Sequence, residues 1–260
     1  MKLTNKTVLI TGGTSGIGLE LAKQLIGRGS TVLVTGRDPE KLEAAKAALP
    51  GVHIFQSDVS SPEAIAALYQ SVITQFPALD VLINNAGIMR NLNLNQERDL
   101  LDVTREIETN LSGPVRMVQQ FLPHLKTRKG ALIVNVSSGL AFVPLPVSPV
   151  YCATKAAIHS FSQSLRAQLN GTSVTVVELA PPGVETPLFR GEFEEEMKGQ
   201  KAMDVTVLAK EAIAGIEAGH LEIRPGLSNV LKTMSRVAPA FMFAQMTKMS
   251  KPKPIKAAAN

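Results

Sequence analysis

Short runs of aliphatic and β-branched residues alternate along the chain with longer segments of helical periodicity. The runs that predict strands are residues 7–11, 31–35, 53–57, 81–84, 131–137, 174–179 and, at a last edge, 221–223. The first intervening segment has apolar residues at helical spacing, namely Leu19, Ala22, Leu25 and Ile26. Strands that alternate with helices pair in parallel through right-handed crossovers. We therefore predict an α/β fold, a doubly wound parallel sheet of about seven strands with helices on both faces.

The length and composition favour one domain. A chain of 260 residues, 45% of them hydrophobic, can bury one sizeable core and is short for two. No continuous apolar run approaches the roughly 18 residues of a membrane span, so we expect a soluble, cytoplasmic protein. Cys152 is the single cysteine, which excludes an intramolecular disulfide. The histidines and cysteine form no cluster at metal-ligand spacing, and we expect no metal.

The net charge of +5 is concentrated at the C-terminal end. Residues 231–260 carry six basic side chains and no acidic one, so the preceding 230 residues sum to −1. The basic character therefore belongs to this extension and does not indicate nucleic-acid binding by the fold.

A glycine-rich segment follows the first predicted strand and leads directly into a helix. Its sequence is Thr11-Gly12-Gly13-Thr14-Ser15-Gly16-Ile17-Gly18. Glycines allow the backbone to approach a pyrophosphate, and the free N–H groups at the start of the helix face its negative charge. An ordinary glycine-rich turn is the alternative, but the strand before and the helix after favour dinucleotide binding. The expected contacts are Gly12, Thr14, Ser15, Gly16, Ile17 and Gly18.

Tyr151 and Lys155 are four residues apart in a segment of helical character, so they share one helix face. A phenol has a pKa near ~10, and an adjacent ammonium lowers it, which makes Tyr151 a usable general acid or base. A surface helix pair is the alternative. Ser138 ends the fifth predicted strand, on the edge where such sheets bind ligands. Ser137 is its competitor, because alternation along a strand lets only one of the two face the site.

These motifs together resemble the short-chain dehydrogenase/reductase family, whose single domain is a Rossmann-type fold. The spacing of Gly12, Gly16 and Gly18, residues 84–87, Ser138, the Tyr-x-x-x-Lys pair and residues 182–183 occur in the family's order. The resemblance implies an NAD(P)-dependent oxidoreductase that moves a hydride between a nicotinamide and a carbonyl or alcohol carbon. Residues 1–230 would form the NAD(P)-binding catalytic domain, and residues 231–260 a basic, Met-rich extension of that domain or a subunit contact.

The resemblance also implies the roles of individual residues. Ser138 would hydrogen-bond the substrate oxygen, Tyr151 would donate the proton, and Lys155 would hold the nicotinamide ribose and tune Tyr151. Asn110 matches an asparagine that holds a water in a proton relay, although a helix start or a buried amide satisfied by backbone is an equal alternative.

Further cofactor contacts follow from the same resemblance. Asp58, with Val59 beside it, would contact the adenine, unless Asp58 is the N-cap of the next helix. Residues expected around the adenosine ribose and the nicotinamide are Asn85, Ala86, Gly87, Pro182, Gly183, Val184 and Thr186. Plain turns are the alternatives for these segments.

The end of the second predicted strand favours NADP over NAD. NAD-selective sites place an acidic residue there, whereas this chain has Thr35-Gly36-Arg37. A guanidinium at Arg37 can form a forked contact with a 2′-phosphate. Asp38 is the competing candidate, but Asp38 followed by Pro39 also matches an N-cap and first turn.

Apolar segments indicate the substrate and the partners. Residues 139–147 and 187–189 are strongly apolar, which suits a small hydrophobic ketone, aldehyde or alcohol. The resemblance implies a homodimer or homotetramer. Residues 231–249 carry an apolar stripe that we expect to pack on its own fold or on a sister subunit, in preference to anionic lipid.

Three other functions fit the sequence less well. A regulatory NAD(P)-binding module without chemistry would not need Ser138, Tyr151 and Lys155 together. Epimerases and dehydratases of the extended branch of the family add a substantial C-terminal domain, and too few residues follow Thr186 for one. Enoyl reductases of the family space their lysine further from the tyrosine.

Overall fold

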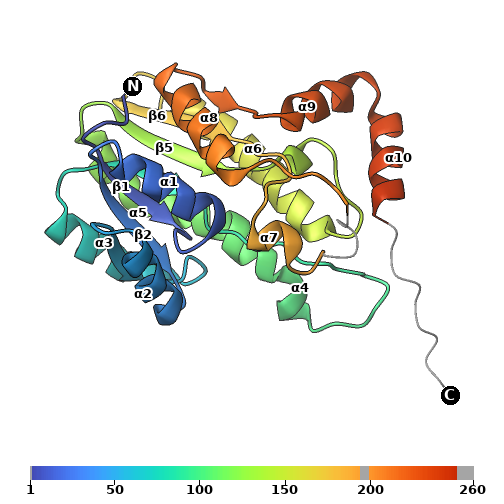
Figure 1. Cartoon of the computed structure of the whole chain (residues 1–260), viewed down its shortest axis with the longest axis horizontal. Coiled ribbons are helices and arrows are strands. Elements are labelled where there is room, and N and C mark those ends of the chain that lie inside the picture. The colour runs from blue at the N-terminus through green and yellow to red at the C-terminus, as the bar shows by residue number, and fades with distance from the viewer. Residues whose placement is uncertain (1, 194–198, 251–260) are drawn as a thin grey trace.

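The computed structural model describes residues 2–193 and 199–250. Its centre is a seven-stranded sheet in the order β3-β2-β1-β4-β5-β6-β7, with every neighbouring pair parallel (Figure 1). The predicted doubly wound fold is confirmed. The strands are β1 (Thr7–Thr11), β2 (Thr31–Gly36), β3 (His53–Gln56), β4 (Leu79–Asn84), β5 (Ala131–Val136), β6 (Val174–Leu179) and β7 (Glu222–Ile223).

Helices connect the strands, and several begin with the same local device. Asp38, Ser61 and Thr186 each accept hydrogen bonds from backbone N–H groups of the first turn and are each followed by proline. The helical segments are α1 (Gly16–Ile26), α2 (Pro39–Ala48), α3 (Pro62–Gln75), α4 (Leu100–Ile107), the π-helical η1 (Glu108–Ser112), α5 (Gly113–Lys126), the 3₁₀ turn η2 (Gly139–Ala141), α6 (Pro149–Gln168), α7 (Pro187–Arg190), α8 (Val205–Glu217), α9 (Leu227–Val237) and α10 (Pro239–Met249).

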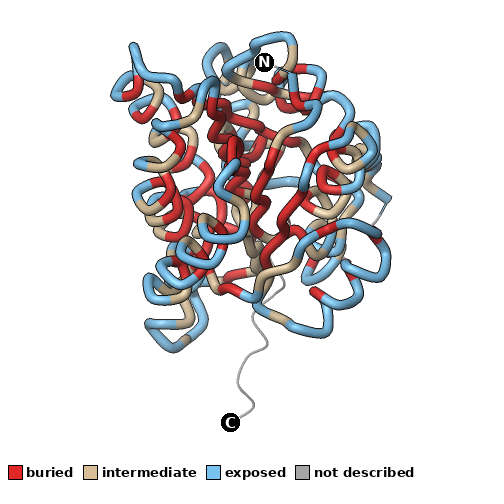
Figure 2. The backbone as a smooth tube through the Cα atoms, turned by 90° about the vertical axis from the view of Figure 1, so that its left-hand side faces the viewer, coloured by how far each residue is buried: buried red, intermediate tan, exposed pale blue. Residues whose placement is uncertain are grey.

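Alternation along the buried strands divides the core between the two faces of the sheet. Val8 and Ile10 of β1 pack with α1, α2 and α8, whereas Leu9 packs with α3, α5 and α6. Figure 2 shows the central strands buried between helices whose outer sides are exposed, and β1, β4 and β5 are buried at every residue. Since both faces are covered there, these strands are rich in aliphatic residues.

A third apolar cluster lies beyond the carboxyl ends of the strands. It joins the loop before α6, including Val143 and Leu145, to Tyr151 on α6 and to Met246 on α10. The C-terminal extension therefore packs over the end of the sheet where ligands bind in such folds.

The boundaries differ from the expected ones at a few places. β4 begins two residues earlier than predicted, because Leu79 pairs with Thr7. β5 ends at Val136, and α9 begins at Leu227, inside the part assigned to the catalytic domain. Residues 251–260 of the predicted extension lie outside the described residues. Across residues 2–193 and 199–250, none of the helices is both long and apolar enough to cross a bilayer.

Candidate active site

A cavity of about 900 Å³ opens at the carboxyl ends of the strands. It collects nearly all of the site residues expected from the sequence. These are Gly12, Thr14, Ser15, Gly16, Ile17, Arg37, Asp58, Val59, Asn85, Ala86, Gly87, Ser138, Tyr151, Lys155, Pro182, Gly183, Val184 and Thr186. The other two residues do not line the cavity but contact residues that do: Gly18 lies against Asn85, and Asn110 is hydrogen-bonded to Ile88.

The glycine turn between β1 and α1 is fixed against the end of β4. Gly12 has a φ of +64°, and a Cβ there would lie 2.8 Å from the Cα of Ala86, so only glycine fits. The amide of Asn85 donates to the carbonyls of Thr11 and Gly12, both at 3.0 Å. A Cβ on Gly18 would lie 2.5 Å from that amide nitrogen. The turn therefore exposes backbone and the N-terminus of α1 to the cavity, a cradle that fits a pyrophosphate.

The end of β2 is basic and half-exposed. The side chain of Arg37 is 58% exposed, and its Nη1 lies 3.8 Å from Oδ2 of Asp58. Asp38 is the N-cap of α2, since its Oδ1 accepts from the N–H groups of Glu40 and Lys41. The capping interpretation of Asp38 is thus confirmed. An exposed guanidinium fork beside the cavity has the geometry that a phosphate monoester needs.

Asp58 is not the N-cap of α3, so that alternative is wrong. Its Oδ1 accepts from the N–H and the hydroxyl of Ser60, while Ser61 caps the helix by accepting from the N–H of Ala64. The carboxylate of Asp58 is held at the cavity edge by this turn.

Ser137 and Ser138 have different partners at the end of β5. Ser137 Oγ donates to the buried Glu178 at 2.5 Å, and Glu178 also contacts His159 Nδ1 at 2.7 Å. Both serines line the cavity, but Ser138 Oγ accepts only from the N–H of Leu140 among the described hydrogen bonds and lies close enough to Tyr151 to lower the pKa of the phenol. Of the two serines, Ser138 is therefore the one that meets the tyrosine.

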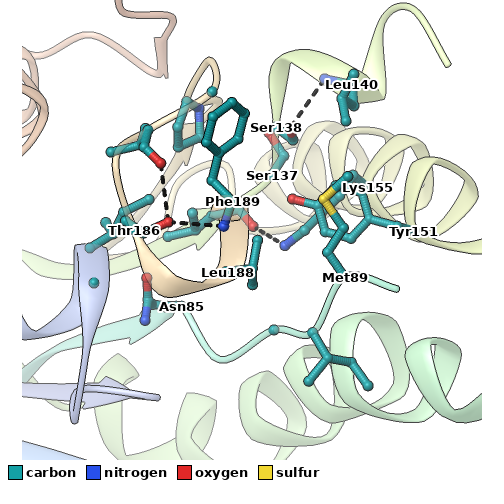
Figure 3. Close-up of a pocket in the computed structure, with 18 of the residues that line it drawn as sticks. Asn85, Met89, Ser137, Ser138, Leu140, Tyr151, Lys155, Thr186, Leu188 and Phe189 are labelled. Atoms are coloured by element: carbon teal, nitrogen blue, oxygen red, sulfur yellow. Dashed lines mark hydrogen bonds between the residues drawn. The ribbon is translucent and has the colours of Figure 1, made fainter. Parts of the chain in front are cut away.

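Tyr151 and Lys155 lie on the same face of α6, as the spacing predicted (Figure 3). Both are almost fully buried, and Nζ of Lys155 lies 5.6 Å from the centre of the Tyr151 ring and donates to the carbonyl of Val136 at 2.8 Å.

The expected lowering of the tyrosine pKa is not what the structure gives. Burial raises the pKa of Tyr151 well above its usual value, and the nearby Ser138 hydroxyl only partly offsets this. Burial also lowers the pKa of Lys155 to about 8. The net shift of the Tyr151 pKa is opposite to the predicted one, because desolvation outweighs the lowering effect of Ser138.

Asn110 is a buried amide satisfied mainly by backbone. Its Oδ1 accepts from the N–H of Ile88 at 2.9 Å, and its Nδ2 donates to the carbonyl of Ile88 and to Thr154 Oγ1. Gly87 separates it from the lysine, since a Cβ there would lie 3.4 Å from Asn110 Oδ1 and 3.6 Å from Lys155 Nζ. Asn110 thus holds the segment after β4 beside Lys155.

The turn after β6 closes the cavity on the side opposite Tyr151. Thr186 Oγ1 donates to the carbonyl of Val184 and accepts from the N–H of Phe189, which orders α7. A Cβ on Gly16 would lie 3.3 Å from Cγ2 of Thr186, so this turn touches the glycine turn. Figure 3 shows Thr186 and Phe189 facing Ser138, Tyr151 and Lys155 across the cavity.

The wall around Tyr151 is apolar, and part of it was missed by sequence reasoning. The expected Leu145 and Phe189 are joined by Met89 and by side chains of the C-terminal helices. These are Val230, Leu231, Met242, Met246 and Met249. The apolar stripe of residues 231–249 was visible in the sequence, but nothing there indicated that it faces the cavity.

Glu106 on α4 is a buried acid that no sequence signal pointed to. Its Oε1 accepts from the N–H of Arg90, and burial raises the pKa of Glu106 to about 7. It acts electrostatically on Tyr151, where a charged Glu106 would disfavour the phenolate.

The structure also gathers three potential metal ligands, His159, Glu178 and Glu222, within 4.8 Å of one another. Protein cations already compensate them, because Lys232 and Arg224 both donate to Glu222. We therefore interpret this cluster as an ion-pair network that ties α9 to the sheet.

Comparison with known proteins agrees with the geometry. The family model for short chain dehydrogenases matches residues 6–197. An uncharacterized oxidoreductase, DltE, of Bacillus subtilis is 43% identical over 247 residues, or 95% of this chain and 98% of the relative. The NADP-dependent 3-hydroxy acid dehydrogenase YdfG of Salmonella typhimurium is 34% identical over 210 residues, covering 79% and 85% of the two chains.

A solved structure extends the agreement to three dimensions. The crystal structure of a short chain dehydrogenase from Burkholderia cenocepacia in complex with NADP superposes with a TM-score of 0.81 and 25% sequence identity. The match covers 95% of this chain and 99% of that one. With the glycine turn, Ser138, Tyr151 and Lys155 gathered in one cavity, this chain belongs to the short chain dehydrogenase family of NAD(P)-dependent oxidoreductases.

Proposed function

We propose that this enzyme interconverts a small, apolar carbonyl compound and its alcohol with NADP(H), and that Tyr151 is its general acid and base. The observation that carries the proposal is the meeting of Ser138, Tyr151 and Lys155 in a cavity that begins at the glycine turn. A nucleotide-binding module without chemistry would not require a buried phenol and a buried ammonium at this point.

The residues along the cavity fit an extended dinucleotide. Residues 12–18 would hold the pyrophosphate, Asp58 and Val59 the adenine, and residues 85–87 the adenosine ribose. Lys155 would bind the nicotinamide ribose, and residues 182–184 with Thr186 the nicotinamide. Arg37 would bind a 2′-phosphate, which favours NADP, and both YdfG and the Burkholderia structure are named for NADP.

The buried side chains would supply the proton that the substrate oxygen takes up during reduction. A bound nicotinamide supplies or accepts the hydride. Ser138 holds the substrate oxygen, and Tyr151, kept neutral by burial, donates its proton to the alkoxide, which is a much stronger base than a phenolate. Lys155 then stabilises the phenolate beside it, and Asn110 positions the segment next to Lys155 for proton return.

The apolar wall around Tyr151 selects the substrate. Phe189, Leu145 and Met246 surround the phenol, so a polar substituent next to the carbonyl would lose its hydration without gaining a partner. Members of this family are commonly oligomeric, and we extend this to a homodimer or homotetramer in the cytoplasm.

The test is a panel of apolar and polar carbonyls offered with NADPH to the wild type and to Tyr151→Phe. We expect oxidation of NADPH with apolar carbonyls, a loss of at least about 100-fold in kcat for Tyr151→Phe, and little change in NADPH binding. Full activity of the variant would refute the role of Tyr151. Inactivity of the wild type across the panel, with NADPH bound, would support the regulatory alternative.

A further inference from the structure

The two C-terminal helices carry large apolar side chains that the fold leaves exposed. We call this set the α9–α10 surface: Leu227, Val230, Val237, Phe241, Phe243 and Met249. Val237 is 74% exposed and Leu227 is 66% exposed. Figure 1 shows α9 and α10 standing at the edge of the molecule, away from the sheet. Exposed apolar groups gathered in this way mark a site of interaction.

The other side of these helices already packs on the fold. Leu231 and Met246 join the cluster around Tyr151, and Ser228 is fully buried against η2. Lys232 pairs with Glu222 of β7 and lies 5.3 Å from the ring centre of Phe142. The helices are thus held in place by their inner sides. Of the expected packing on its own fold or on a sister subunit, packing on the fold itself is found for Leu231 and Met246.

Charge indicates what covers the exposed side. From Pro225 to Asn260 the sequence contains no acidic residue, and of the six basic residues after position 230 only Lys232 is paired with Glu222 on the inner side among those that the structure describes. Arg236 and Lys248 are exposed beside the apolar side chains. Two copies of such a surface would bring like charges together, whereas an anionic lipid surface would be attracted to it. Apolar side chains flanked by basic ones are the composition of helices that lie in a membrane interface.

Residues of the α9–α10 surface also line the catalytic cavity. Val230 and Met249 are both 46% exposed or more, and both line the cavity. A substrate that enters between them passes from the α9–α10 surface to Tyr151 along apolar side chains. A compound dissolved in acyl chains could therefore reach the site without crossing water, which costs apolar molecules free energy.

We propose that the α9–α10 surface docks on an anionic lipid bilayer, with its apolar side chains among the acyl chains and its basic residues at the headgroups. Docking itself does not depend on the proposed reaction. Only the consequence that the enzyme draws an apolar substrate from the bilayer rests on it.

The experiment is co-sedimentation of the full chain with vesicles, which needs no turnover. We expect binding to vesicles of equal parts phosphatidylcholine and phosphatidylglycerol, and at least about tenfold weaker binding to pure phosphatidylcholine or at high salt. The double variant Phe241→Ser/Phe243→Ser should bind at least about tenfold more weakly. The matched control is Leu100→Ser/Leu101→Ser, an exposed pair on α4 that should bind like the wild type.

Two further readouts separate the outcomes. NADPH binding and reduction of a water-soluble carbonyl should be the same in the Phe241/Phe243 variant and the wild type, which shows that the variant folds. Equal binding of all proteins to both vesicles, or no binding, overturns the proposal. So does light scattering that finds the Phe241/Phe243 variant split into smaller assemblies than the control, because the surface would then be a subunit interface.

Discussion

Tyr151, Lys155 and Glu106 are titratable side chains in one apolar environment, and burial moves each toward its neutral form. It raises the pKa of Tyr151 and of Glu106 and lowers that of Lys155. A neutral phenol retains its proton until a stronger base forms beside it. The site thus stores a proton for an alkoxide and does not release it to water at neutral pH.

Replacement of Glu106 by glutamine should make stability less dependent on pH. The pKa of Glu106 is about 7 in the folded state against an ordinary 4.5, so the folded chain holds a proton that the unfolded chain releases between these values. The contribution of Glu106 to the free energy of unfolding is therefore present at low pH and is lost as the pH rises through 7. Between pH 5 and pH 8 the free energy of unfolding of the wild type, measured in urea, should fall by about 2 kcal/mol relative to that of Glu106→Gln. Parallel pH curves for the two proteins would contradict this.

Arg37 should decide which cofactor is used. Loss of a charge-assisted, forked contact to a 2′-phosphate costs on the order of 1.5–3 kcal/mol, so Arg37→Ala should raise KM for NADPH at least about tenfold. KM for NADH should stay within about twofold, because NADH lacks that phosphate. Arg105→Ala, an exposed arginine on α4, is the control and should change neither value. A wild type that prefers NADH would remove the basis of this prediction.

The two serines that follow β5 have different partners because the backbone there is extended. Successive side chains of a strand point in opposite directions, and here one serine is bound to Glu178 while the next meets Tyr151. Glu178 is itself buried on β6 and also bonds His159 of α6. Both serines follow β5 and line the cavity, but the Ser137 hydroxyl is engaged by Glu178 of β6, whereas the Ser138 hydroxyl lies close to Tyr151.

Neighbouring serines should therefore give opposite phenotypes. Ser137→Ala leaves the buried Glu178 without one donor and should lower the free energy of unfolding by about 1–3 kcal/mol, with kcat nearly unchanged. Ser138→Ala should lower kcat at least about tenfold and change stability by less than about 1 kcal/mol. Urea unfolding and steady-state kinetics on both variants measure the contrast. A loss of kcat in Ser137→Ala equal to that in Ser138→Ala would refute it.

The elements differ in how far their sequence predicts them. β1 and β6 match their predicted bounds, because apolar runs between turn residues leave little choice. The capped start of α2 at Asp38 was likewise readable. The π-helical turn η1 has no local signature, and the cap of α3 falls on Ser61 because Asp58 is engaged in its own turn.

Within the site, position was predictable and electrostatics was not. The strand ends and the helix spacing indicated that Tyr151 and Lys155 meet. The sign of the tyrosine pKa shift depends on how deeply the ring is buried, and the cluster around the ring includes residues far along the chain, such as Phe193 and Met246. Helical spacing predicts that two residues are adjacent, but burial of their side chains depends on residues that are distant in the sequence.

At the scale of the whole molecule, the cavity is lined both by residues at the ends of the strands and by residues of the C-terminal helices. The cofactor end of the cavity lies at β1 and β2, and the apolar end lies under α9 and α10. Binding of NADPH and turnover of substrate are therefore separable by changes in α10.

Met246→Asp should demonstrate that separation. A charge in place of a buried methionine is strongly disfavoured and should displace α10 from the Tyr151 cluster. We expect kcat/KM for apolar carbonyls to fall at least about tenfold, with the Kd of NADPH within about threefold. Ala244→Asp, an exposed position on the same helix, is the matched control and should behave like the wild type. Equal loss of NADPH affinity in Met246→Asp would show that the two ends are not independent.

The order of these parts along the chain has a consequence for synthesis. The glycine turn, Arg37 and the ends of β1 and β2 are synthesised well before Leu231 and Met246. A nascent chain therefore contains its expected nucleotide-binding residues before it contains the helices that cover Tyr151. The phenol becomes shielded from water only after α10 has been synthesised, so a chain that stops before α10 carries no working catalyst.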